Sequence, residues 1–200
     1  MFAVILDAKM GIDERTLWDK KYSEHSHTSL EPDPLLVSAY DEFLSGSAPG
    51  LALDVAGGVG RHSIWLVQRG WRVKLVDISK IGVKQALENA KQTGTASSII
   101  TEIRDLNSDQ DLDQARYDLV VVFFFLQREL FPALISAIKP CGLLIYKTYT
   151  TEQRRFEGGP SHPMFLLEPN ELLHAFSSMR VLHYHETVAE KGVAELVARK

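Results

Sequence analysis

The sequence predicts an α/β fold, a doubly wound and mostly parallel sheet of seven strands with helices on both faces. Three observations predict it: short apolar runs recur along the chain, helical segments separate most of them, and glycine or proline turns mark the boundaries. The length of 200 residues suits one domain. We therefore expect residues 1–200 to form a single domain, in which residues 1–48 are an N-terminal helical cap.

The first 50 residues carry mainly helical signals. Residues 16–44 are predicted to be helical with a break at residues 31–34, because two prolines there exclude a continuous helix. Residues 45–50 are a turn cluster of Ser, Gly and Pro. Met10 follows the apolar start of the chain closely, so we expect residues 1–9 to be either a start-site extension or a loosely held arm.

Two strand–helix units follow this turn cluster. Residues 51–55 are an apolar run that ends in glycines, which predicts a buried parallel strand, and residues 64–69 continue as a helix that Gly70 ends. Residues 72–77 predict the second strand. Ser79 is a suitable N-cap for a helix that runs to about Gln92.

The second half of the chain continues the alternation. Residues 117–125 have the strongest strand composition of the whole sequence. Further strands are predicted at residues 99–104, 143–149, 181–185 and 194–198, and helices at residues 129–138 and 169–177. The last helix is expected to begin at Pro169, since proline suits a first helical position. A turn at residues 139–142 and a loop at residues 150–163 connect these elements.

Charge and cysteine content exclude several classes of protein. The 22 Lys and Arg against 26 Asp and Glu leave a net charge of −4, which argues against a general nucleic-acid binder. No apolar run approaches the ~18–20 residues that a membrane-spanning helix needs. Cys141 is the single cysteine, and the seven histidines show no metal-ligand spacing, so we predict no disulfide and no metal site. We expect a cytoplasmic monomer or homodimer that has neither nucleic acid nor membrane as a partner.

The most informative segment is the glycine-rich turn after the first predicted strand. Asp54 precedes a run of small residues that contains Ala56, Gly57, Gly58 and Gly60, and a helix opens directly after them. Small residues let the backbone approach a ligand closely, and the free N–H groups of a helix start suit a carboxylate or a phosphate. The segment therefore predicts a ligand site at the carboxyl end of this strand.

Two further acids follow the next two predicted strands. Asp77 comes 17 residues after Gly60, where a carboxylate can accept hydrogen bonds from both hydroxyls of a ribose. Asp105 follows the third strand and could bind the amino group of an adenine. Each acid has a structural alternative: Asp54 and Asp77 could cap helices, and Asp105 could stabilise a turn.

The nature of the ligand depends on Asp54 and Ser63. A nicotinamide-binding fingerprint would place glycine or alanine at position 63, where this chain has Ser63. Asp54 would repel a pyrophosphate but suits the ammonium group of an amino-acid-like ligand. S-Adenosylmethionine has such an ammonium together with a ribose and an adenine. A nicotinamide-dependent oxidoreductase remains the less favoured alternative.

From about Trp18 onward the chain resembles the class I S-adenosylmethionine-dependent methyltransferases. The Asp-x-Gly-x-Gly-x-Gly pattern of that superfamily matches Asp54, Ala56, Gly58 and Gly60, with alanine in place of the first glycine. The resemblance implies a Rossmann-like sheet with an antiparallel last strand, and S-adenosylmethionine as the cofactor with S-adenosylhomocysteine as product. The cofactor-binding residues that we expect are Trp18, Tyr22, Asp54, Ala56, Gly57, Gly58, Gly60, Asp77, Ile78, Asp105, Leu106, Phe123 and Phe124.

Within the superfamily the chain is most similar to the tellurite-resistance and thiol-methyltransferase-like group. The shared features are Trp18, Asp19 and Tyr22 followed by Pro34, and the segments 60–61, 126–128 and 165–172. Trp18 and Tyr22 are four residues apart and so share one helix face, which the group uses as a cap over the cofactor. This chain departs from the tellurite enzymes at residues 186–192, which are short and lack a His-Arg pair before the last strand.

We therefore expect methyl transfer to a small-molecule acceptor by in-line displacement, with a thiol or another soft nucleophile favoured. A nearby cation could stabilise the anionic form of such an acceptor, and Arg61, Arg128 and His162 are the candidates. Tyr149, near the carboxyl end of the fifth strand, could line the acceptor pocket. A protein that binds S-adenosylmethionine without catalysis is the second alternative.

Overall fold

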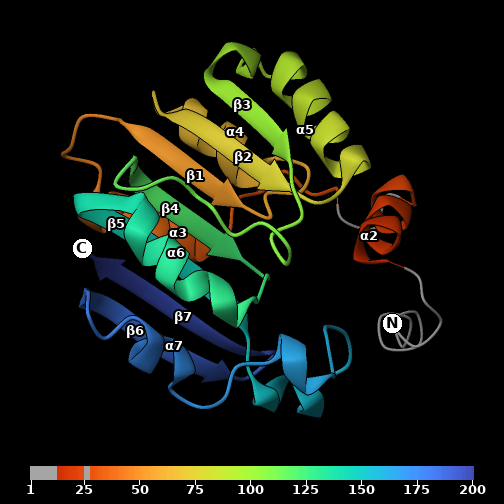
Figure 1. Ribbon diagram of the computed structural model, residues 1–200, viewed down its shortest axis with the longest axis vertical. Coiled ribbons are helices and arrows are strands. Elements are labelled where there is room, and N and C mark those ends of the chain that lie inside the picture. The colour runs from red at the N-terminus through yellow and green to blue at the C-terminus, as the bar shows by residue number, and fades with distance from the viewer. Residues whose placement is uncertain (1–12, 25–27) are drawn as a thin grey trace.

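The computed structural model describes residues 13–24 and 28–200. The expectation for residues 1–9 lies outside the described residues. The seven strands form one sheet in the order β3-β2-β1-β4-β5-β7-β6 (Figure 1). The strands are β1(Leu51–Val55), β2(Arg72–Asp77), β3(Ile99–Ile103), β4(Tyr117–Phe123), β5(Ile138–Tyr149), β6(Arg180–Val188) and β7(Gly192–Arg199).

The pairing of the strands confirms the predicted sheet. β1 pairs in parallel with β2 and β4, β2 with β3, and β4 with β5. The last strand, β7, is antiparallel to both β5 and β6. As a result the carboxyl ends of β1 to β5 meet at one edge of the sheet, where ligands of doubly wound proteins bind.

Helices cover both faces of the sheet, as expected. They are α2(Glu14–Ser23), α3(Pro34–Phe43), α4(Arg61–Val67), α5(Lys80–Gln92), α6(Phe131–Ala137) and α7(Glu171–Ala175). Leu36 of α3 and Leu66 of α4 share one buried cluster with the sheet, whereas Leu134 of α6 and Leu172 of α7 share another. α5 packs beside α4, and α2 lies beyond one end of α5 (Figure 1). No helix in residues 13–24 and 28–200 is both long and apolar enough to cross a membrane.

Several predicted boundaries were wrong, four of them for local reasons. The strand predicted at residues 117–125 ends at Phe123, because Phe124 has a positive φ of 56° that breaks the extended backbone. The helix expected from Pro169 begins at Glu171, since Asn170 before it is left-handed at φ 62°. The helix that opens after Gly60 ends at Val67, two residues before its predicted end at residue 69. The turn expected at residues 139–142 is an irregularity inside β5, where the register with β4 shifts.

Candidate functional site

The glycine-rich turn connects β1 to α4 with three left-handed residues. Ala56, Gly58 and Gly60 have φ values of 54°, 54° and 81°. Gly60 is the N-cap residue of α4, where a positive φ favours glycine. Ala56 has a side chain in the same region of φ, which costs about 1–2 kcal/mol of backbone strain. The turn therefore uses small residues at three left-handed positions, with strain at the one position that lacks glycine.

Asp54 is buried at the end of β1, with 1% of its surface exposed. Its Oδ2 accepts hydrogen bonds from the backbone N–H of Ser63, at 3.1 Å, and from the Ser63 hydroxyl, at 2.7 Å. Asp54 thus caps the first turn of α4 through Ser63. Capping is the structural role that the sequence offered as the alternative to ligand binding. Burial raises the pKa of Asp54 to about 6, with the Ser63 hydrogen bonds opposing the rise. The ionised form of Asp54 therefore destabilises the folded protein.

Asp77 lies at the end of β2, beside the glycine turn. Its Oδ2 accepts the N–H of Gly58 and its Oδ1 accepts the N–H of Ser79, both at 2.8 Å. Burial raises the pKa of Asp77 to about 6 although these hydrogen bonds lower it. Each carboxylate oxygen can accept a second hydrogen bond, so both remain able to bind hydroxyl groups.

Helix α2 closes over this turn through its aromatic residues. Trp18 and Tyr22 stack with their ring centroids 5.8 Å apart. Tyr22 is buried, and a Cβ added at Gly58 would collide with its hydroxyl. Burial raises the pKa of Tyr22, so its hydroxyl stays protonated. The side-chain amide of Gln85 in α5 donates to the Tyr22 carbonyl at 3.1 Å, which links α2 to α5.

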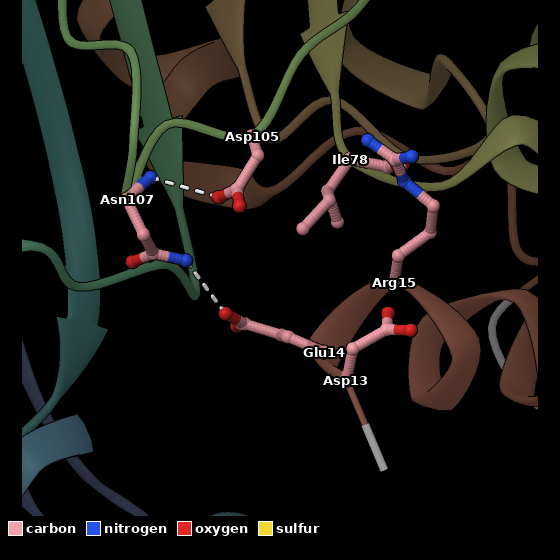
Figure 2. A pocket seen from close by; sticks show the side chains of 6 residues that line it. All are labelled: Asp13, Glu14, Arg15, Ile78, Asp105 and Asn107. Carbon is pink, nitrogen blue, oxygen red and sulfur yellow. Dashed lines mark hydrogen bonds between the residues drawn. The ribbon is translucent and has the colours of Figure 1, made fainter. Parts of the chain in front are cut away.

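A cleft of about 260 Å³ lies between α2 and the loops that follow β2 and β3. Its lining residues are Asp13, Glu14, Arg15, Ile78, Asp105 and Asn107, and Figure 2 shows them arranged around an open space. The amide of Asn107 donates to Glu14 at 2.7 Å across the cleft, and the Arg15 side chain donates to the Ile78 carbonyl at 3.2 Å. The structure thus brings the predicted residues Ile78 and Asp105 to one cavity.

The sequence reasoning missed four of the six residues that line this cleft, since they carry no motif. The missed residues are Asp13, Glu14, Arg15 and Asn107. Asp105 also accepts the N–H of Asn107 at 2.9 Å, so its turn-stabilising alternative is present as well. Leu106 is 4% exposed and belongs to the main core rather than to the cleft lining.

A second group of predicted residues meets where β4 and β5 end. Phe123 is buried against His62, with ring centroids 4.1 Å apart, whereas Phe124 is half-buried and packs on Tyr149 at 5.0 Å. The guanidinium of Arg61 lies 6.0 Å from the centre of the Phe124 ring. Lys191, which the sequence reasoning missed, lies 5.9 Å from the same ring. Arg61, Phe124 and Tyr149 therefore share one site with this additional lysine.

Arg128 and His162 are not part of that group. Arg128 forms an ion pair with Glu171 and donates to the carbonyls of Leu166, at 2.8 Å, and Met164, at 3.3 Å. The Glu171 carboxylate raises the pKa of Arg128. His162 is exposed and caps a short 3₁₀ turn through Nδ1. Among the described residues, neither side chain makes a hydrogen bond, ion pair or ring contact with Arg61 or Tyr149, which supports structural roles for both.

A buried ion cluster below Phe124 was also missed. Lys147 of β5 lies 3.0 Å from Asp33, the N-cap residue of α3, and 2.8 Å from Glu195 of β7. The backbone N–H of Asp33 donates to Nε2 of His62 at 3.3 Å, so Nδ1 of that ring carries the proton. Burial lowers the pKa of His62, which keeps the ring neutral. A lysine inside the apolar run 143–149 was the sequence signal for this cluster.

Comparisons with known proteins agree with this architecture. Residues 19–194 match the family model described as tellurite resistance protein TehB. The structure resembles TehB from Haemophilus influenzae, with a TM-score of 0.69 and 20% identity over 92% of this chain and 67% of that one. It also resembles 1,6-didemethyltoxoflavin-N1-methyltransferase from Burkholderia thailandensis, with a TM-score of 0.68 and 15% identity over 93% and 86% of the two chains. At such identities these structural likenesses show the fold.

One curated relative matches by sequence. It is ribosomal RNA small subunit methyltransferase C from Alcanivorax borkumensis, which is 35% identical over 97 residues. The match covers 48% of this chain and 28% of the relative, so it spans only about a quarter of that protein's length.

Proposed function

The chain belongs to the TehB family of class I S-adenosylmethionine-dependent methyltransferases, and we propose that it methylates a soft atom, a thiol first of all, of a small-molecule acceptor. Its cofactor is S-adenosylmethionine and its coproduct S-adenosylhomocysteine. The observation that carries the proposal is the continuous series of groups along the carboxyl edge of the sheet. It runs from the cleft at Ile78 and Asp105, past Asp77 and the glycine turn, to Phe124.

The residues along this edge fit the cofactor. The cleft offers an aliphatic wall from Ile78 and acceptor oxygens from Asp105, which suit an adenine with its exocyclic amino group. Asp77 can accept ribose hydroxyls beside its two backbone hydrogen bonds. The carboxyl group of Asp54 is buried and its pKa is raised, so an ammonium group nearby would stabilise its ionised form.

We include the other expected residues in the same site. Trp18 and Tyr22 close it from α2, and the small residues Ala56, Gly57, Gly58 and Gly60 let the backbone of the turn lie close to Tyr22, beside which we place the amino-acid end of the cofactor. Phe123 and Phe124 stand at the end of β4, on the side toward the acceptor. Residues 1–200 are proposed to act as one catalytic domain, and the cytoplasm and a monomeric or homodimeric state remain the expected location and assembly.

When bound, S-adenosylmethionine supplies an electrophilic methyl group on a sulfonium sulfur, which keeps the electron pair of the broken bond and becomes a neutral thioether. The task of the protein is then to hold the acceptor in line with the methyl carbon at ~3–3.5 Å and to exclude water. Tyr22 covers the glycine turn, while the rings of Phe124 and Tyr149, tilted by 44° to each other, form an aromatic wall for the acceptor. The positive charge of Arg61 favours the thiolate form of the acceptor, and the proton of the thiol passes to solvent.

Calorimetric titration tests the cofactor assignment. The protein is titrated with S-adenosylmethionine and S-adenosylhomocysteine, and with NADH and NADPH as controls. We expect micromolar binding of the first two, weakened at least about tenfold in Asp77→Ala because two hydroxyl acceptors are lost. Asp109→Ala removes an exposed carboxylate and should bind as the wild type does. Selective binding of a nicotinamide cofactor would instead favour the oxidoreductase alternative.

An acceptor panel tests the reaction. Thiols, selenite and tellurite salts, and ribosomal RNA are incubated with the protein and S-adenosylmethionine, and S-adenosylhomocysteine formation is followed. We expect turnover of small thiols and none of RNA, since the chain carries a net charge of −4. Tight cofactor binding without turnover of any acceptor would support the non-catalytic alternative. Methylation of RNA alone would contradict the small-molecule assignment.

A further inference from the structure

We infer that the acceptor is an anionic organic thiol, one that carries a carboxylate, and that Arg61 and Lys191 bind this carboxylate beside Phe124. The inference rests on the proposed function and names the class of molecule that the acceptor end of the site selects. It follows from the proximity of both cations to Phe124, from the hydrogen bonds that fix the backbone next to Lys191, and from the position of Arg61 next to the glycine turn.

The first observation is that two cations lie near one aromatic ring, and in the described part of the chain neither has a carboxylate at ion-pair distance. Arg61 begins α4 and Lys191 directly precedes β7, yet each lies about 6 Å from the Phe124 ring, at 6.0 Å and 5.9 Å. Within residues 13–24 and 28–200, no carboxylate oxygen lies within 4.0 Å of either cation, the limit for an ion pair. Lys147, by contrast, pairs with two carboxylates, those of Asp33 and Glu195. The face of a ring attracts a cation but does not neutralise it.

The second observation is that the backbone around Lys191 is held in place. The N–H of Gly192 donates to Oε1 of Gln153 at 3.0 Å, and the carbonyl of Gly192 accepts from Thr150 at 3.0 Å. Gln153 is 2% exposed, and a Cβ added at Gly192 would collide with its backbone. The turn that carries Lys191 is therefore attached to the segment directly after β5, which fixes the backbone from which the exposed Lys191 side chain reaches Phe124.

The third observation is the position of the pair relative to the cofactor. Arg61 directly follows Gly60 of the glycine turn, and Phe124 and Tyr149 stand where β4 and β5 end. Both cations have the Phe124 ring as a neighbour, so an anion bound by them would lie beside this ring, close to the glycine turn that Arg61 follows. A carboxylate at one end and a thiol at the other match this arrangement.

The inference predicts a preference between two acceptors that differ only in charge. We compare kcat/KM for 3-mercaptopropionate and for its uncharged amide, 3-mercaptopropionamide. The wild type should prefer the acid by about tenfold or more. Lys191→Glu should remove that preference by lowering kcat/KM for the acid, while the value for the amide changes less than about twofold. Lys191→Arg keeps the charge and should retain the preference.

The matched control is Lys91→Glu, which makes the same charge change at an exposed position near the end of α5. It should behave as the wild type with both acceptors. Binding is measured separately, by titrating the protein loaded with S-adenosylhomocysteine with 3-(methylthio)propionate and with its amide. The acid should bind at least about tenfold more tightly, and only in proteins that keep a cation at position 191.

The outcomes separate this inference from the proposed function. Equal kcat/KM for acid and amide, or the same loss in Lys91→Glu as in Lys191→Glu, overturns the carboxylate site while methyl transfer to thiols stands. Failure to methylate either thiol, although S-adenosylhomocysteine binds, overturns the proposed acceptor class and this inference with it. A charge-dependent preference confined to position 191 supports both.

Discussion

Asp54→Asn should make the protein more stable and a poorer cofactor binder at the same time. The Asp54 carboxylate is buried, and burial raises its pKa from 3.8 to about 6. That difference corresponds to about 3 kcal/mol by which the ionised side chain destabilises the folded state at pH 8. Asparagine removes the charge, and its side-chain oxygen can still accept from the Ser63 N–H and hydroxyl.

The sign of the pH dependence follows from the same pKa. The folded state binds a proton more tightly than the unfolded chain, so this group makes stability fall as pH rises through the window from 3.8 to about 6. At pH 5 the penalty is only about half of its value at pH 8. The substitution should therefore raise the free energy of unfolding by about 1–3 kcal/mol at pH 8, and by about half as much at pH 5.

The assay is urea denaturation at pH 5 and pH 8, followed by titration with S-adenosylmethionine. Binding should weaken about tenfold or more, because the ammonium group loses its counter-charge. Asp118→Asn is the control with the opposite sign: Lys139 and the Leu51 N–H hold the pKa of Asp118 below its usual range, so its loss should destabilise the protein at pH 8. A destabilised Asp54→Asn protein, or a gain that is no larger at pH 8 than at pH 5, would refute the reasoning.

Three further substitutions test the packing of the site. Gly58→Ala should weaken cofactor binding and destabilise the protein, because the new Cβ collides with Tyr22, whereas Gly94→Ala has a similar φ and open space and should cost only about 1 kcal/mol in denaturation. Lys147→Met leaves the buried Asp33 and the half-buried Glu195 without their cation and should cost about 3–5 kcal/mol. A loss below about 1 kcal/mol would contradict the stabilising role of this ion cluster. Arg128→Ala should lower stability and expose residues 164–171 to proteolysis, while kcat for the methylation of a thiol stays within about twofold of the wild-type value. A large loss of kcat in a folded protein would restore Arg128 as a catalytic candidate.

The sheet and the cofactor edge were predictable because both follow from local patterns. An apolar run of five residues before glycines must be buried on both faces, and the structure has β1 at those five residues. Asp54, Asp77 and Asp105 each follow or end a predicted parallel strand, and such ends necessarily meet at one edge. Element order and the position of the acids therefore needed no tertiary information.

The exact ends of several elements depended on contacts that local patterns do not contain. Phe124 ends β4 because its backbone turns to a positive φ and its N–H bonds to the Lys147 carbonyl. Pro169 does not begin α7, because Asn170 takes the left-handed conformation and its N–H bonds to Glu186. These contacts form only when distant strands and loops pack together, so composition alone favoured longer elements.

The sequence by itself determined the alternation of strands and helices, the glycine turn and the three acids at the strand ends, because periodicity and turn composition act over a few residues. Only the tertiary structure decided which side chains from distant segments lie together. Arg128 forms an ion pair with Glu171, which is 43 residues away in the sequence. Lys147 likewise binds Asp33, from which it is separated by 114 residues. Such long-range meetings depend on how whole elements pack, and no local signal in the chain specifies them.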